Sequence, residues 1–197
     1  MGFACNNEHG RKMLLTSLAP QAGERILHLG VRGARSGLAL AKQFPEAYFV
    51  AVETEETALV AVNKKIKAQK ITNLKVLPLI ACRFHSEAAS FDKAVSLLML
   101  HSLQPADKLA FLKEILRVLR RGGTLHIGNL DTPQTSREQS GLKLARYLFG
   151  EAAAQAHLDG TWVKMLREVG FSGIRHTASY SATLGRVVLV RARRPIN

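Results

Sequence analysis

The feature that most constrains the fold of this chain is a regular alternation between short apolar runs and longer stretches of helical periodicity. Runs rich in β-branched and aromatic residues predict strands. Five such runs follow one another, at residues 25–29, 48–52, 74–80, 93–97 and 124–127, and helical stretches separate most of them. Two more alternating runs, 174–180 and 186–191, flank Leu184-Gly185 and predict a terminal hairpin.

The stretches between the strands place apolar residues three or four positions apart, with charged residues between them. They predict helices at residues 38–44, 55–70, 107–119, 136–149 and 162–169. Thr54 is the expected N-cap of the second helix, and Ser136 with Gln139 is the expected capping box of the fourth. Gly122-Gly123 is expected to end the third helix, and Gly170 the last.

Strand–helix pairs in series build a mostly parallel sheet with helices on both faces, and the hairpin adds an antiparallel edge. We therefore expect an α/β fold. A length of 197 residues suits a single domain over 1–197, and a second domain would be cramped. In such a sheet a ligand lies at the carboxyl ends of the strands, near the switch point beside the first strand.

The charge balance points to an anionic partner. Lys and Arg number 28 against 15 Asp and Glu, a net charge of +13. This excess favours attraction to RNA, DNA, an acidic lipid surface or an acidic protein, without selecting among them. No apolar run approaches the ~20 residues of a membrane span, and the first eight residues lack the pattern of a secretory signal.

The chain has two cysteines, Cys5 and Cys82. They are too few and too far apart for a disulfide framework or a zinc cluster. We therefore expect a reducing, cytoplasmic setting and no metal site.

Gly30 and Glu53 stand where folds of this kind hold a ribose-containing cofactor. Gly30 lies in the turn after the first strand, where the backbone can approach a ligand at a helix N-terminus. Glu53 ends the second strand about 20 residues later, where a carboxylate can bond both hydroxyls of a ribose. Each has a structural alternative, because Gly30 can serve only the turn and Glu53 can be an exposed strand-end acid.

Further motifs follow in order: Phe91-Asp92, Leu100 to Leu103, Leu116 to Leu125, and Val169 to Phe171 before the hairpin. As an ordered set they resemble the class I S-adenosylmethionine-dependent methyltransferases, and are most similar to the branch with the ubiquinone and menaquinone biosynthesis methyltransferases. The resemblance implies a Rossmann-like sheet of seven strands with the last strand inserted antiparallel. It also implies S-adenosylmethionine at the carboxyl ends of strands one, two and four.

The resemblance implies that the cofactor is held by residues that follow the strands. They are Gly30, Arg32, Gly33, Glu53, Thr54, Ala81, Cys82 and Leu97. The chain departs from the family pattern in the turn, where His28 replaces an acid and Arg32 and Ala34 replace the second and third glycines. Ile80 or Ala81 stands where the family has an acid that bonds the adenine amino group.

Two hypotheses of function follow. In the first, the protein is an enzyme that transfers a methyl group from S-adenosylmethionine to a small or prenylated acceptor, with no catalytic residue assigned. An N-terminal helical cap, 1–22, and a short insert, 131–160, would cover the acceptor. In the second, the fold is a degenerate, non-catalytic scaffold for RNA or an acidic partner. His101 lies near the acceptor side in the family, although a lone histidine is more often structural.

Overall fold

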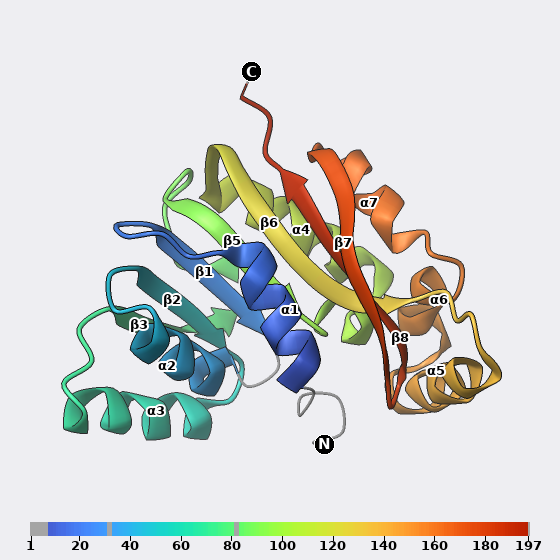
Figure 1. Ribbon diagram of the computed structural model, residues 1–197, viewed down its shortest axis with the longest axis horizontal. Helices are drawn as coiled ribbons and strands as arrows, with labels where there is room; N and C mark the ends of the chain where they lie inside the picture. Colours follow the sequence, from blue (N-terminus) through green and yellow to red (C-terminus); the bar gives the residue numbers. More distant parts are fainter. Residues whose placement is uncertain (1–7, 31–32, 81–82, 197) are drawn as a thin grey trace.

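The computed structural model describes residues 8–30, 33–80 and 83–196. One sheet runs through the centre of this region, with its strands in the order β4-β3-β2-β1-β5-β6-β8-β7 (Figure 1). The strands are β1 (Arg25–Gly30), β2 (Tyr48–Glu53), β3 (Leu74–Ile80), β4 (Arg83–Phe84), β5 (Phe91–Leu97), β6 (Leu119–Asp131), β7 (Ser172–Ala182) and β8 (Gly185–Arg193). The expected mostly parallel sheet with an antiparallel C-terminal hairpin is confirmed.

In the described residues the sheet has eight strands rather than the seven expected. The additional strand, β4, is two residues long and pairs antiparallel with the end of β3, with Leu79 opposite Phe84. A strand of two residues has no measurable periodicity, so no sequence pattern predicts it.

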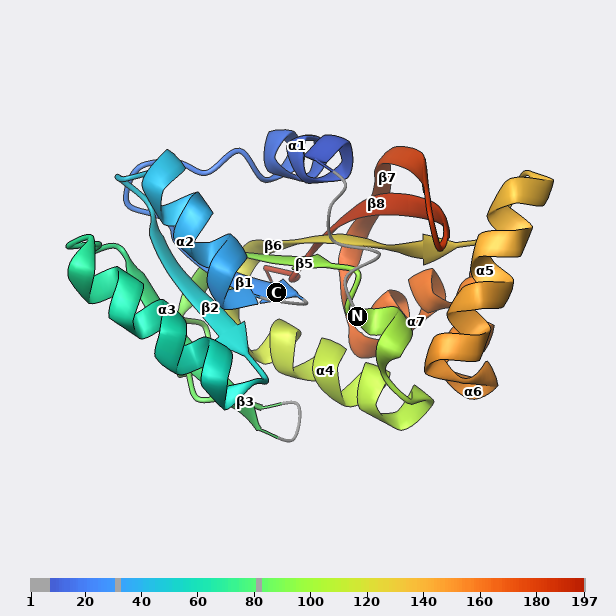
Figure 2. The same cartoon turned by 90° about the horizontal axis from the view of Figure 1, so that it is seen from below.

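Helices cover both faces of the sheet (Figure 2). On one face lie α1 (Glu8–Leu18), α2 (Gly33–Gln43) and α3 (Glu56–Ala68), and on the other lie α4 (Pro105–Val118), α6 (Glu151–Leu158) and α7 (Trp162–Val169). A further helix, α5 (Ser136–Phe149), packs beside β8, and the 3-10 helix η1 (Leu100–Ser102) precedes α4. Within the described ranges, no helix combines the length and the apolarity needed to cross a membrane.

The caps of α3 and α5 each lie one residue from the expected position. Glu55, not Thr54, is the N-cap of α3, because the Thr54 N–H donates to the Glu53 carboxylate and Thr54 remains in the turn. Thr135, not Ser136, is the N-cap of α5, and its hydroxyl accepts from the Glu138 N–H at 3.2 Å. Thr135 and Glu138 have the same spacing as the expected pair, so the pattern alone does not fix the register.

The expected helix end at Gly122-Gly123 is wrong, because α4 ends at Val118 and both glycines belong to β6. Leu119 pairs with Phe91 of β5, which draws the chain into the sheet directly after the helix. Gly170, by contrast, ends α7 in the left-handed conformation that favours glycine, as expected.

The carboxyl end of α4 is closed by a residue far along the chain. Arg194 Nη1 donates to the carbonyl oxygens of Leu116 and Arg117, both at 2.9 Å, and also to that of Leu119. A guanidinium suits this place, because it supplies donors and positive charge where a helix has unpaired carbonyls and the negative end of its dipole. The end of β8 thus stabilises a helix on one face of the sheet.

Close packing fixes α2 above the ends of β1 and β2. Gly37 faces β2 so closely that a Cβ atom on it would lie 2.7 Å from the Cβ of Ala51. Only a residue without a side chain permits this approach. The start of α2 is therefore held against the sheet at the edge where the parallel strands end.

Candidate functional site

The carboxyl ends of β1, β2 and β5 form the switch point of the sheet. β1 pairs in parallel with β2 on one side and with β5 on the other, and Gly30 at its end is opposite Leu97. A Cβ atom on Gly30 would lie 3.3 Å from the Leu97 carbonyl oxygen, which is tighter than a side chain normally tolerates. Gly30 therefore permits the close approach of β1 to the end of β5, at the place where a doubly wound sheet binds its ligand.

Glu53 is a buried carboxylate at the end of β2. Its residue is 5% exposed, so the structural alternative of an exposed strand-end acid is wrong. Oε1 accepts hydrogen bonds from the backbone N–H of Thr54 at 2.9 Å and of Glu55 at 3.3 Å. These bonds, together with the N-terminus of α3 that follows, stabilise a negative charge in the buried position and fix the direction of the carboxylate.

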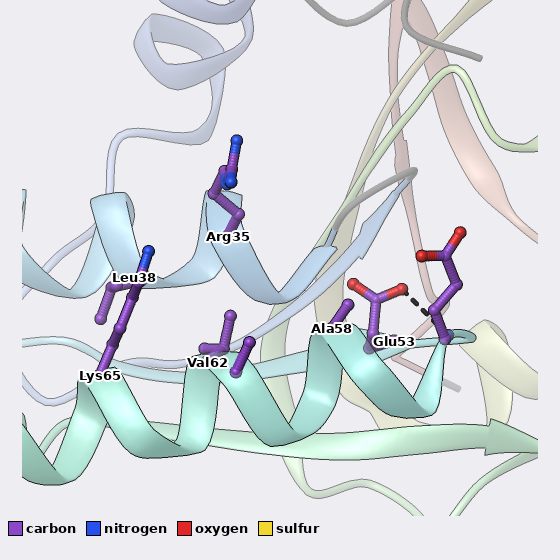
Figure 3. A pocket seen from close by; sticks show the side chains of 8 residues that line it. Arg35, Leu38, Glu53, Ala58, Val62 and Lys65 are labelled. Atoms are coloured by element: carbon purple, nitrogen blue, oxygen red, sulfur yellow. Dashed lines mark hydrogen bonds between the residues drawn. The ribbon is translucent and has the colours of Figure 1, made fainter.

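A cavity of about 320 Å³ extends from Glu53 between α2 and α3. Its charged lining includes Arg35 and Lys65, which lie along it, and Glu55 at the start of α3 (Figure 3). Leu38 and Val62 add apolar surface. The cavity therefore combines a carboxylate at one end with apolar walls, as expected for a site that takes a polar organic molecule.

The other predicted cofactor residues divide into two groups. Gly33 begins α2, exposed Thr54 directs its N–H to Glu53, and Leu97 ends β5 beside Gly30. Arg32, Ala81 and Cys82 lie outside the described residues, so their predicted part in the site stays a prediction.

A buried polar cluster lies beyond β5 and β6, on the other side of the switch point. His101 of η1 places Nδ1 3.1 Å from Oδ1 of Asn129, which also accepts from the Leu130 N–H at 3.0 Å. Since this oxygen can only accept, His101 carries its proton on Nδ1. Burial lowers the pKa of His101 to about 4, so the ring is neutral at physiological pH.

The cluster continues under α6. His157 donates from Nδ1 to the Leu130 carbonyl at 2.9 Å, so its Nε2 accepts from Lys108 Nζ at 3.3 Å. Lys108 also donates to the Ala153 carbonyl. Both side chains are fully buried, and burial lowers the pKa of Lys108 to about 8 and that of His157 to about 3.

Two aromatic residues close this cluster. Phe149 of α5 packs edge-on against the His101 ring at 4.7 Å between centroids. Trp162 of α7 stacks obliquely near His157 and donates from Nε1 to Asp131 at 3.1 Å. The result is a rigid wall of neutral imidazoles and aromatic rings, which can position a ligand but holds no nucleophile activated by a base.

Sequence reasoning missed Lys108, Asn129 and His157. Lys108 had a signal, because it lies three and four positions before Phe111 and Leu112, on the apolar face of its helix. Asn129 lies in the segment Gly128–Asp131 that follows the fifth predicted strand, where a ligand is expected, but no spacing indicates its pairing with His101 or that of His157 with Lys108, because only the folded chain brings together residues 28 and 49 positions apart. In the described ranges no three His, Cys, Asp or Glu side chains are grouped so as to hold a metal ion.

Comparison with known proteins identifies the fold. Residues 26–123 match a sequence family described as a methyltransferase domain. No curated protein sequence matches the chain. Among solved structures, phosphoethanolamine N-methyltransferase 2 of Haemonchus contortus, determined with phosphomonomethylethanolamine and S-adenosylhomocysteine, aligns with a TM-score of 0.73 at 15% identity. The alignment covers 96% of this chain and 53% of that protein, so this chain spans about half of its length.

A second similar structure is a S-adenosylmethionine-dependent methyltransferase from Aquifex aeolicus, with a TM-score of 0.66 and 16% identity over 95% of this chain and 94% of that one. The YcgJ protein of Bacillus subtilis aligns with a TM-score of 0.71 at 11% identity, over 95% and 99% of the two chains. At these identities the likeness shows the fold. None of these proteins selects the ubiquinone and menaquinone branch, and none supports a non-catalytic scaffold.

Proposed function

We propose that this protein, which has the class I methyltransferase fold, transfers a methyl group from S-adenosylmethionine to a small acceptor. The methyltransferase family that matches residues 26–123 binds this cofactor. The observation that carries the proposal is the buried carboxylate of Glu53 at the end of β2, oriented by two backbone N–H groups. A carboxylate at this position of a doubly wound sheet is suited to bond the two hydroxyls of a ribose.

The residues at the switch point fit the cofactor in shape and in charge. Gly30 adds no side chain where β1 approaches Leu97, and the cavity beside Glu53 offers room between α2 and α3. We assign Gly30, Gly33, Glu53, Thr54 and Leu97 to cofactor binding, with Arg32, Ala81 and Cys82 as the remaining members of the proposed set. S-adenosylmethionine supplies a methyl group already activated by its sulfonium, so the protein needs to bind and align rather than activate.

The cluster around His101 is the proposed acceptor wall. Asn129 is fully buried, and its Nδ2 has no hydrogen-bond partner among the described residues. An unpaired amide donor such as Asn129 Nδ2 favours a methyl-acceptor molecule that carries an oxygen or nitrogen lone pair able to accept its hydrogen bond. Phe149 packs directly on the His101 ring, and this close packing favours a small acceptor over a bulky one. The small acceptor bound to the Haemonchus contortus enzyme is consistent with this size.

Binding of S-adenosylhomocysteine to a Glu53→Ala variant tests the proposal. Each charge-assisted hydrogen bond to a ribose hydroxyl is worth about 1.5–3 kcal/mol. Loss of the carboxylate should therefore weaken binding at least tenfold, which corresponds to about 1.4 kcal/mol. Isothermal titration calorimetry measures the affinity, and methyl transfer itself is followed as S-adenosylhomocysteine released from S-adenosylmethionine with pooled small-molecule acceptors.

Glu56→Ala is the matched control, because Glu56 is an exposed acid in the first turn of α3 and its substitution removes the same charge as Glu53→Ala. It should change the affinity less than twofold. Equal affinities of wild type and Glu53→Ala for S-adenosylhomocysteine would show that the ribose assignment is wrong. Absence of binding to the wild type would refute the proposed function as a whole.

A further inference from the structure

Three arginines occupy one exposed face of the β7–β8 hairpin, and we call them the arginine ladder: Arg175, Arg191 and Arg193. Arg175 is opposite Arg191 in the antiparallel register, and Arg193 lies two residues further along β8. Residues opposite one another, and residues two apart, project from the same face of a sheet. All three are exposed. Three guanidinium groups therefore share one face at the edge of the sheet.

Within the described ranges the ladder residues have no ion pair, whereas several other arginines of the chain are paired or act as caps. Arg117 pairs with Glu114, Arg120 with Asp92, and Arg146 with Glu151, while Arg194 caps α4. For the ladder residues, no ion-pair partner exists in the part of the chain that the structure describes. Like charges directly opposite in a sheet are destabilising. The hairpin thus carries a repulsive arrangement that no acid of the described fold relieves.

The charge of the ladder affects a buried residue of the sheet. His126 of β6 is opposite Arg191 on the side of β8 away from Arg175. Burial, then the charge of Arg191, then that of Lys93 lower the pKa of His126 to about 4. The charge of Arg191 thus acts on a buried neighbour in the sheet as well as on its surface.

The geometry points to a binding surface for single-stranded nucleic acid on this face of β7 and β8. Residues two apart on a strand are separated by about 6.8 Å, which is similar to the distance between successive phosphates of an extended nucleic-acid strand. β7 is also the edge strand, so its outer backbone N–H groups are available as further phosphate donors. Neither strand carries an exposed large apolar side chain, which disfavours insertion into a lipid surface.

This surface is distinct from the proposed methyl-transfer site. Arg191 and Arg193 are level with His126 and Thr124 in the middle of β6, whereas the site lies where the parallel strands end. β8 ends on the side of the sheet opposite to the carboxyl ends of the parallel strands (Figure 1). The bound strand is therefore a partner held at the hairpin rather than the methyl acceptor.

The test compares two variants with the same loss of charge. R175Q/R191Q/R193Q removes the ladder, and K64Q/K67Q/K70Q removes three exposed lysines in and just after α3. Fluorescence anisotropy with labelled oligo-U and oligo-dT, at a series of salt concentrations, measures affinity and its salt dependence. For single-stranded nucleic acid, each phosphate contact contributes about 0.7 to the slope of log affinity against log salt concentration. The ladder variant should therefore lower this slope by about 2 and weaken binding at least tenfold at low salt. The lysine variant should keep most of the wild-type slope.

Thermal unfolding separates this role from a structural one. Because the three arginines repel one another, the ladder variant should melt at the same temperature as wild type or higher, and should bind S-adenosylhomocysteine equally well. Oligo-U and oligo-dT arms distinguish RNA from DNA. Equal oligonucleotide binding by the two variants would overturn the proposal. So would ladder-dependent binding that is tighter to phosphatidylserine vesicles or to polyglutamate than to either oligonucleotide.

Discussion

Three buried histidines should make the stability of this protein fall steeply in mild acid. Burial is the main cause that lowers the pKa of His101 and His126 to about 4 and that of His157 to about 3, against 6.5 for an unperturbed ring. The folded state thus binds these protons more weakly than the unfolded state. The stability that each neutral ring contributes is complete above pH 6.5, and it is lost as the pH falls from there toward the folded pKa values.

The size of the effect follows from the shifts. Between pH 7 and pH 5, each histidine with these pKa values removes about 2 kcal/mol from the free energy of unfolding, and the three together remove about 5–6 kcal/mol if they act independently. A domain has a total stability of about 5–15 kcal/mol. Protonation of the three rings should therefore remove a large part of the stability by pH 5.

Urea unfolding at pH values from 5 to 7.5 gives the free energy of unfolding at each pH. The slope of that free energy against pH gives the number of protons taken up on unfolding. At pH 5.5 this number should lie between about two and three. His126→Gln should lower this number by about one proton, whatever its effect on stability at pH 7. A free energy that stays constant within about 1 kcal/mol from pH 7 to pH 5 would refute the reasoning.

Two further predictions concern packing and capping. Gly37→Ala, which usually stabilises a helix, should here cost about 1–3 kcal/mol of unfolding free energy, because its Cβ would meet Ala51 at 2.7 Å; a gain in denaturant midpoint would contradict the close approach of α2. Arg194→Ala should cost about 1–3 kcal/mol by exposing three carbonyls at the end of α4. Arg121→Ala removes a comparable exposed cation with a single backbone contact and should change the midpoint little, so equal losses would mean that capping is unimportant.

The order of strands and helices could be predicted because each has a pattern within itself. The run that became β2 is apolar from Tyr48 to Val52, as a strand buried on both faces must be, and β1 and β5 each contain a shorter apolar run. Helix α7 was placed at Trp162–Val169 because Gly170 marks its end. Helix α6 was missed, since Glu151–Leu158 consists largely of alanines and lacks a capping signal. Its position depends on the buried contact between His157 and Lys108.

The candidate site was predictable only where it depends on backbone geometry. Gly30 and Glu53 follow from the position of strand ends in a doubly wound sheet, and the structure brings both to the switch point. The hydrogen bond between His101 and Asn129 joins η1 to β6 through side chains, and no local spacing encodes it. Gly122-Gly123 shows the converse error, because a local glycine signal gave way to pairing between β6 and β5.

The place of β8 between β6 and β7 also constrains the order in which the fold can form on the ribosome. β7 is synthesised before β8 but has no partner in the sheet until β8 has paired with β6. At about 5–20 residues per second, β6 waits several seconds with an open edge, and β7 is the nearest strand that could occupy it wrongly. β8 is favoured because Val187 to Val190 bury apolar side chains on both faces, whereas β7 is largely exposed. The polar character of β7 thus protects the nascent sheet against closing one strand too early.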